Sequence, residues 1–183
     1  MDTKLDLTFA QVVTKQIEDY VYAEVLFYPV NPVGGLQLPP LTIGNWLETD
    51  WRLTALGVSD PSLDAARAEV QRVRTERLDL YQNKARREFK SRIDTWTLWL
   101  SDQGNAANIQ RAYGNDPAYP TQVHVRFKLE LLKDHVPQPD IQLARLIATD
   151  DDLRRHSKPG TFVWDKDLIP AAPKDKYWWL YGA

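Results

Sequence analysis

The spacing of the prolines constrains this chain more than any other feature, because proline is excluded from the interior of an α-helix. Twelve prolines divide the 183 residues, and the longest gap runs from Pro61 to Pro117. Long helices can form only within such gaps. Inside the longest one, apolar residues recur at helical spacing: first Leu63, Ala66, Val70, Val73, Leu80 and Tyr81, and then, after a phase shift, Ala85, Phe89, Ile93, Trp96 and Leu100.

This pattern predicts a single helix over residues 62–103. A helix of about 40 residues would extend about 60 Å, at about 1.5 Å per residue. Asp60 can cap its N-terminus, and Pro61 suits the first helical position. Few compact domains of this size need such a rod. We therefore expect it to bend, to break near its polar middle at Arg77 or Asn83, or to protrude and pack against another chain.

Shorter helices are expected in the other gaps between prolines. Thr8 and Gln11 fit a capping box, in which side chains satisfy otherwise unpaired backbone N–H groups. Thr42 can cap a second helix, and Gly57 supplies the left-handed residue that ends it. The expected shorter helices cover residues 8–28, 43–56, 121–135 and 140–148.

The predicted fold class is therefore all-α. We expect an elongated helical bundle around the long helix, with the helix 43–56 lying across one end. Residues 158–183 are expected to form an irregular, aromatic C-terminal tail that packs on the side of the bundle. The sequence contains no repeat, low-complexity tract or clear interdomain linker, so residues 1–183 are interpreted as a single domain.

The composition excludes several classes of protein. The formal net charge is −2, which is unlike the strong positive field of a histone-like protein. The chain has no cysteine, which excludes disulfides, thiolate metal sites and cysteine nucleophiles. The longest apolar stretch, Val25–Val30, is far shorter than the roughly 20 residues that span a bilayer, and Met1–Leu7 has no signal-peptide core. We expect a cytoplasmic protein without membrane association.

The histidines and a run of aspartates are the candidate metal ligands in the sequence. His124 and His135 fall on one face of a continuous helix but about 16 Å apart, which is too far for one zinc ion. His156 could join only one of them. The run Asp150–Asp152 could contact a hard cation, but acidic residues also favour a helix N-terminus, which is the simpler interpretation. No metal and no cofactor are expected.

No catalytic motif stands out in the sequence. It has neither a GxSxG nucleophile elbow nor a phosphate-binding loop, and Gly34-Gly35 lacks the lysine that such a loop requires. Two carboxylates brought together by separate helices would leave no motif. We interpret the chain as non-catalytic, and an enzyme or small-ligand binder with a site between helices is an alternative.

A basic cluster on the long helix is a candidate contact for nucleic acid. Cationic stripes bind phosphates through an interaction that salt weakens. The alternative is a solvated helix face with intrahelical ion pairs such as Glu88 with Arg92. The cluster consists of Lys84, Arg86, Arg87, Lys90 and Arg92.

The aromatic tail is a candidate surface for a protein partner. Trp and Tyr are enriched at the centres of protein interfaces, but the same rings could close the chain's own core. The leading hypothesis is a non-catalytic helical subunit for protein–protein interaction or assembly, with self-association included. The candidate partner-binding residues are Tyr177, Trp178, Trp179 and Tyr181.

Overall fold

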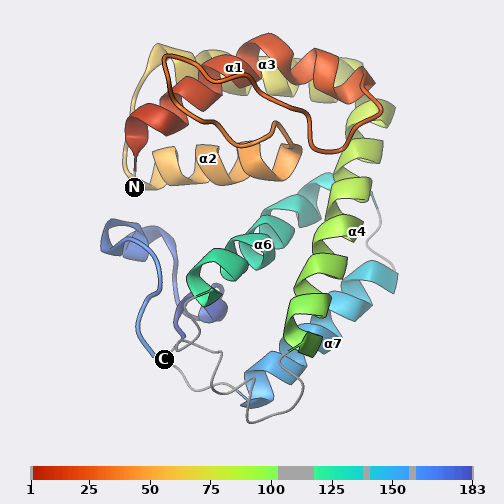
Figure 1. Cartoon of the computed structure of the whole chain (residues 1–183), viewed down its shortest axis with the longest axis vertical. Coiled ribbons are helices and arrows are strands. Elements are labelled where there is room, and N and C mark those ends of the chain that lie inside the picture. The colour runs from red at the N-terminus through yellow and green to blue at the C-terminus, as the bar shows by residue number, and fades with distance from the viewer. Residues whose placement is uncertain (1, 103–117, 138–140, 157–159, 183) are drawn as a thin grey trace. The chain divides into compact units, whose positions relative to one another are not determined.

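The computed structural model describes residues 2–102, 118–137, 141–156 and 160–182 (Figure 1). These residues form α-helices and short 3-10 turns, and they contain no β-strand; isolated bridges include Tyr28–Leu41 and Val33–Leu36. The predicted all-α class is confirmed for this part of the chain. None of the described helices combines the length and the apolar character that a membrane span would need.

The residues divide into two compact units. The first consists of Met1–Phe89 with Leu131–Pro137, and the second of Lys90–Glu130 with Gln138–Ala183. The single domain expected over residues 1–183 remains a prediction.

Helix α1, Thr3–Tyr22, differs from the predicted helix 8–28 at both ends. The side chain of Asp2 accepts a hydrogen bond from the backbone of Leu5 and caps the helix. Thr8, the predicted cap, lies inside the helix, where its hydroxyl donates to a carbonyl one turn earlier. After Tyr22 the backbone becomes extended, in agreement with the β-prone composition of the segment that follows.

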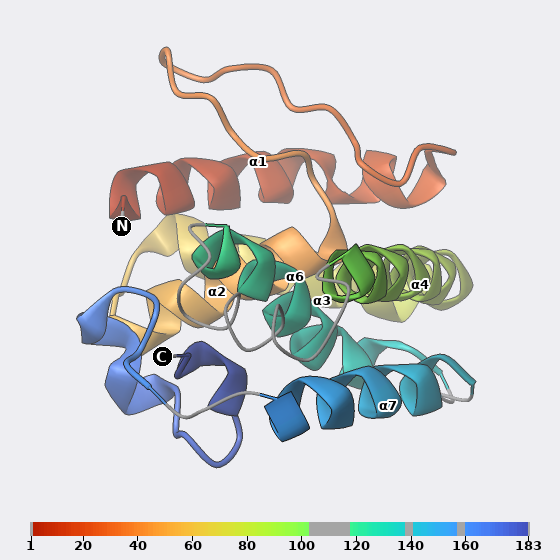
Figure 2. The ribbon, with the colours of Figure 1, turned by 60° about the horizontal axis from the view of Figure 1, so that its bottom comes forward.

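Helix α2, Ile43–Ala55, follows the sequence signals closely. Thr42 accepts a hydrogen bond from the backbone of Asn45 at 3.0 Å, and Gly57 adopts the left-handed conformation with a φ of 65°. The connection between α1 and α2 runs back along α1 and then returns to the start of α2 (Figures 1 and 2).

The prediction of one helix over 62–103 is wrong, because the chain forms α3, Pro61–Glu76, and α4, Leu78–Asp102. The break falls at Arg77, one of the two positions where the sequence indicated that the rod could break. Arg77 occupies the place in the apolar stripe between Val73 and Tyr81, both of which are buried. Its guanidinium instead pairs with Glu18 of α1 at 3.3 Å. A charged residue thus interrupts the stripe at the point where the helix ends.

In the first unit, α1 packs against both α2 and α3 (Figure 1). The N-terminus of α3 begins as predicted, with Asp60 accepting from the backbone of Ser62 at 2.8 Å and Pro61 at the first helical position. The buried residues of α3 are Leu63, Ala66, Val70 and Val73, which confirms the first apolar stripe as a core face.

Among the residues that the structure describes, two further α-helices follow α4 along the chain. Helix α6, Tyr119–Leu132, continues into a 3-10 turn, Lys133–His135, in good agreement with the predicted helix 121–135. Helix α7, Ile141–His156, does not end at Ala148 as expected, since no helix-breaking residue follows that position. Asp150–Asp152 therefore lie inside a helix, and their interpretation as a helix N-terminus is wrong.

The C-terminal segment belongs to the second unit. It contains two 3-10 turns, Lys166–Ala171 and Trp178–Leu180. The backbone N–H of Gly160 donates to Tyr181, and that of Val163 donates to Leu180 at 2.9 Å. These hydrogen bonds join the two ends of the segment.

Candidate functional site

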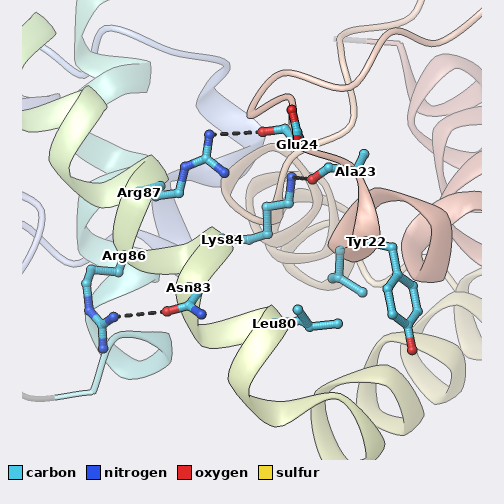
Figure 3. Close-up of a pocket in the computed structure, with 9 residues that line it drawn as sticks. Tyr22, Ala23, Glu24, Leu80, Asn83, Lys84, Arg86 and Arg87 are labelled. Atoms are coloured by element: carbon cyan, nitrogen blue, oxygen red, sulfur yellow. Dashed lines mark hydrogen bonds between the residues drawn. The ribbon is translucent and has the colours of Figure 1, made fainter.

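A surface pocket of about 360 Å³ lies in the first unit, where the C-terminal end of α1 meets the beginning of α4 (Figure 3). The sequence places it there because Leu80, Lys84 and Arg87 follow one another at helical spacing and share one face of α4. The lining residues are Val21, Tyr22, Ala23, Glu24, Leu80, Asn83, Lys84, Arg86 and Arg87.

Lys84 lines this pocket and is almost fully buried, with 3% of its surface exposed. Its Nζ donates hydrogen bonds to the carbonyl oxygens of Ala23 and Val25, at 2.5 and 2.6 Å. It also lies 4.7 Å from the centre of the Tyr20 ring. Burial lowers the pKa of Lys84, and the neighbouring charge of Arg87 lowers this pKa further.

The position of Lys84 has a clear electrostatic reason. The last carbonyl groups of a helix lack partners within the helix and carry the negative end of the helix dipole. An ammonium group placed beside them supplies both hydrogen-bond donors and positive charge. Of the two carbonyl groups that Lys84 binds, that of Ala23 belongs to the C-cap residue of α1 and that of Val25 to the segment that follows it. Lys84 therefore holds the chain where it leaves α1, a role that the sequence pattern of the basic cluster did not indicate.

Arg86 and Arg87 are exposed and bind only neutral oxygens among the described residues. Arg86 donates to the side-chain oxygen of Asn83 at 3.0 Å, and Arg87 donates to the carbonyl of Glu24 at 2.9 Å (Figure 3). Neither forms an ion pair with a carboxylate in the part of the chain that the structure describes. Each guanidinium keeps further N–H donors for another molecule.

The other two members of the basic cluster, Lys90 and Arg92, belong to the second unit. Lys90 is exposed and pairs with Asp94 at 3.1 Å, while Arg92 is buried. The structure thus separates the five cations into two buried and three exposed side chains. The predicted nucleic-acid contact stays untested, but only the exposed members are available to a phosphate backbone.

Several large, exposed apolar side chains line the pocket or lie within a few residues of its lining residues in the sequence. Tyr22, Val25, Phe27 and Leu78 are each between 47% and 57% exposed. Tyr22 lines the pocket, and the carbonyl of Val25 binds Lys84. Leu78 follows Arg77, whose guanidinium carbon lies 5.9 Å from the centre of the Tyr22 ring. We define the α1–α4 surface as Tyr22, Val25, Phe27, Leu78, Arg86 and Arg87.

The predicted partner-binding residues of the tail are distributed differently. Tyr177 and Trp179 are buried in the second unit, and Trp178 and Tyr181 are half-buried. The guanidinium carbon of Arg126 lies 3.7 Å from the centre of the Trp179 ring. The Tyr181 hydroxyl donates to the carbonyl of Ala172 at 2.7 Å. Trp178 and Tyr181 retain some surface for a partner, whereas Tyr177 and Trp179 pack in the chain's own core.

No group of histidine and carboxylate side chains that could hold a metal ion occurs among the described residues. His124 stacks on Trp164 with ring centres 4.3 Å apart, and His135 lies 3.0 Å from the hydroxyl of Tyr81. The side chain of His156 lies outside the described residues. Asp150 pairs with Arg126 at 2.7 Å, and Asp152 pairs with Arg155.

Sequence reasoning found the cations of the pocket but missed Tyr22, Glu24, Leu80 and Asn83. Tyr22 and Glu24 were assigned to the interior of a helix that was expected to run to residue 28. Helix α1 ends at Tyr22, and the residues on both sides of this end line the pocket. Comparisons with models of protein families, with curated proteins and with solved structures found no match to this chain.

Proposed function

We propose that this chain is a non-catalytic subunit for protein–protein interaction and that it binds its partner through the α1–α4 surface. The observation that carries the proposal is the exposure of four large apolar side chains in the two segments that contribute to the pocket. Tyr22, Val25 and Phe27 lie at or after the end of α1, Leu78 begins α4, and each is about half accessible to solvent. Contiguous patches of exposed apolar side chains mark interaction sites, and the proposal is that these four residues contribute to one such patch.

The composition of the surface supports this proposal. Aromatic residues and arginine are enriched in protein interfaces, and they dominate the residues that contribute most to binding. Lysine and glutamate, which are depleted there, are represented by the buried Lys84 and by Glu24 at the pocket. The tail was the first expected partner surface, but half of its candidate residues are buried, so it supports the proposal less well.

Cross-linking in the source cells, followed by mass spectrometry of the purified chain, tests the proposal. We expect intermolecular links to concentrate within residues 22–27 and 78–87. Links spread evenly over the chain, or confined to the second unit, would contradict it. Light scattering on the purified chain then distinguishes self-association from a different partner, because self-association produces a defined oligomer without any added protein.

A variant pair makes this test specific. Tyr22→Ser with Leu78→Ser removes apolar area from the α1–α4 surface, and we expect it to abolish those links. Leu98→Ser with Ile147→Ser removes comparable exposed side chains from the second unit, where the two residues are 61% and 52% exposed. This matched pair should leave the links unchanged.

The structure also bears on the alternative of a small-ligand binder, because the pocket lies between two helices. Its volume of about 360 Å³ is at the small end of the range for ligand sites. Thermal stabilisation by an organic anion from a metabolite panel would favour this second candidate, since a ligand that binds only the folded state raises its stability.

A further inference from the structure

We propose that the partner contributes an acidic peptide segment, which places one apolar side chain in the pocket and carboxylates against Arg86 and Arg87. This inference rests on the proposed interaction function and specifies the chemistry of the partner.

The charges of the pocket favour an anion. Three cationic side chains line it, against the single carboxylate of Glu24. An arginine guanidinium presents five N–H donors in a planar fork that matches the two oxygens of a carboxylate. Arg86 and Arg87 each donate one hydrogen bond to a neutral oxygen of the chain, so most of their donors remain available.

Lys84 strengthens this preference without binding the partner directly. Its Nζ donates to the carbonyl oxygens of Ala23 and Val25, and the side chain lines the pocket while only 3% of its surface is exposed to water. A buried charge acts over a longer range than an exposed one, because the protein interior has a lower dielectric constant than water.

The shape of the pocket favours an apolar side chain beside the anionic groups. Val21, Tyr22 and Leu80 contribute apolar walls, and the volume of about 360 Å³ suits one large side chain rather than an extended ligand. Val25 and Phe27 are exposed and follow the lining residue Glu24 closely in the sequence. A peptide segment covers both the pocket and these neighbours, whereas a small anion would leave the apolar side chains in water.

A nucleic acid fits these observations less well. A phosphate backbone repeats its charge along the strand and is matched by a track of exposed cations. In the first unit the track is short, because Lys84 is buried and Arg86 and Arg87 are the remaining cations of the pocket. The carboxylate of Glu24 would repel phosphates at the same place.

Fluorescence anisotropy with labelled probes and the full chain tests the proposal. The first probe is a peptide in which glutamates flank a single phenylalanine. The second replaces the phenylalanine by alanine, the third replaces the glutamates by lysines, and the fourth is a single-stranded oligonucleotide of equal charge. We expect the first peptide to bind most tightly and its affinity to fall with added salt.

Charge-reversal variants test whether Arg86 and Arg87 are the residues that bind the carboxylates of the peptide. The double variant Arg86→Glu/Arg87→Glu should lower the affinity for the first peptide by about tenfold or more, since it replaces two attractive contacts by repulsive ones. The matched control Arg155→Glu/Lys166→Glu changes the net charge equally, at exposed residues of the second unit. The control should bind the peptide as the wild type does.

Several outcomes would overturn the proposal. Equal binding of the phenylalanine and alanine peptides would remove the pocket from the interaction, and preference for the oligonucleotide would identify a nucleic acid instead. Equal weakening by both double variants would indicate nonspecific charge attraction. If no peptide binds while cellular cross-links still map to the α1–α4 surface, the acidic partner is wrong and the interaction function stands. If the cross-links are also absent there, both are wrong.

Discussion

The Nζ atom of Lys84 on α4 lies 2.5 Å from the carbonyl oxygen of Ala23, the residue that follows the last turn of α1. This hydrogen bond joins the first residue of the basic cluster to the end of a helix that is distant in the sequence. The same ammonium group also satisfies the carbonyl of Val25. Two neighbouring cations, Lys84 and Arg87, thus hold the backbone segment that follows α1.

We expect Lys84→Met to lower the free energy of unfolding by about 1–3 kcal/mol, the usual cost of leaving a buried polar group without its partner. Chemical denaturation at neutral pH measures this change. Arg86→Met is the matched control, because Arg86 is exposed and donates only to Asn83. It should change the stability by no more than about 0.5 kcal/mol. Equal stability of the two variants would contradict the capping role.

His135 should make the stability of the chain dependent on pH. Burial, reinforced by the charge of Arg74, lowers the pKa of His135 from 6.5 to about 4. Between about pH 6.5 and pH 4 the unfolded chain therefore binds a proton that the folded chain does not, and the free energy of unfolding falls as the pH falls. Well above about pH 6.5 the side chain is neutral in both states, so it adds no pH dependence to the free energy of unfolding.

Thermal unfolding of the wild type and of His135→Gln over pH 4–7 checks this expectation. Glutamine does not titrate and can still form a hydrogen bond with Tyr81, which lies 3.0 Å from the His135 ring. As the pH falls, the unfolding temperature of the wild type should decrease more than that of His135→Gln. Other titrating groups cancel in this difference. A constant difference would show that His135 takes up a proton as readily in the folded state.

The two adjacent tryptophans of the tail should differ in their effect on folding. Trp179 is 2% exposed, and its carbonyl accepts a hydrogen bond from the hydroxyl of Tyr119 at 2.6 Å. Trp179→Ala should cost about 3–5 kcal/mol, as is usual for a buried aromatic residue. Trp178 is half-buried, so Trp178→Ala should cost clearly less.

Near-ultraviolet circular dichroism and urea denaturation of both variants measure the effect on the second unit. Deletion of residues 174–183 removes both rings, and we expect it to unfold that unit rather than to leave a folded chain without a partner. A folded, stable deletion variant would show that the buried tail is dispensable for the core.

The ion pair between Arg126 and Asp150 offers a test of coupling in the second unit. The Arg126 side chain is 4% exposed, and its guanidinium contacts Asp150 at 2.7 Å and Glu130 at 3.2 Å. Arg126→Met leaves both carboxylates without this cation, and we expect a loss of about 3–5 kcal/mol.

A double-mutant cycle with Asp150→Asn separates the pair from its surroundings. Asp150→Asn should recover part of the stability that Arg126→Met loses, because it removes one of the two carboxylates left behind. Additive losses in the double variant would show that the two side chains do not stabilise each other. The free energies of unfolding of all four proteins, measured under one set of conditions, decide between these results.

Local signals predicted several features of the fold correctly. Thr42, Gly57, Asp60 and Pro61 act within a few residues of their own position, through backbone N–H groups or through a preferred φ angle. The apolar residues of α3 form a core face for the same reason, since their spacing alone places them on one side of a helix. These features require no knowledge of the distant parts of the chain.

The errors concern competition between local signals and distant contacts. Asp2 rather than Thr8 caps α1, in agreement with the higher N-cap preference of aspartate, although threonine is also among the favoured residues. The break at Arg77 was one of several outcomes consistent with the pattern, and its ion pair with Glu18 of α1 could not be read from the sequence of α3 and α4. The pocket was missed because it depends on where α1 ends.

The sequence by itself determined the all-α class, the starts of α2 and α3 and the presence of a basic cluster, because these follow from spacing and from the intrinsic preferences of single residues. Only the tertiary structure decided which cations of that cluster are buried and which are exposed. Lys84 is buried because the end of α1 presents carbonyl groups to it, while Arg86, two residues further along, faces solvent. Burial is a property of the neighbours that folding brings together, and helical periodicity alone does not identify those neighbours.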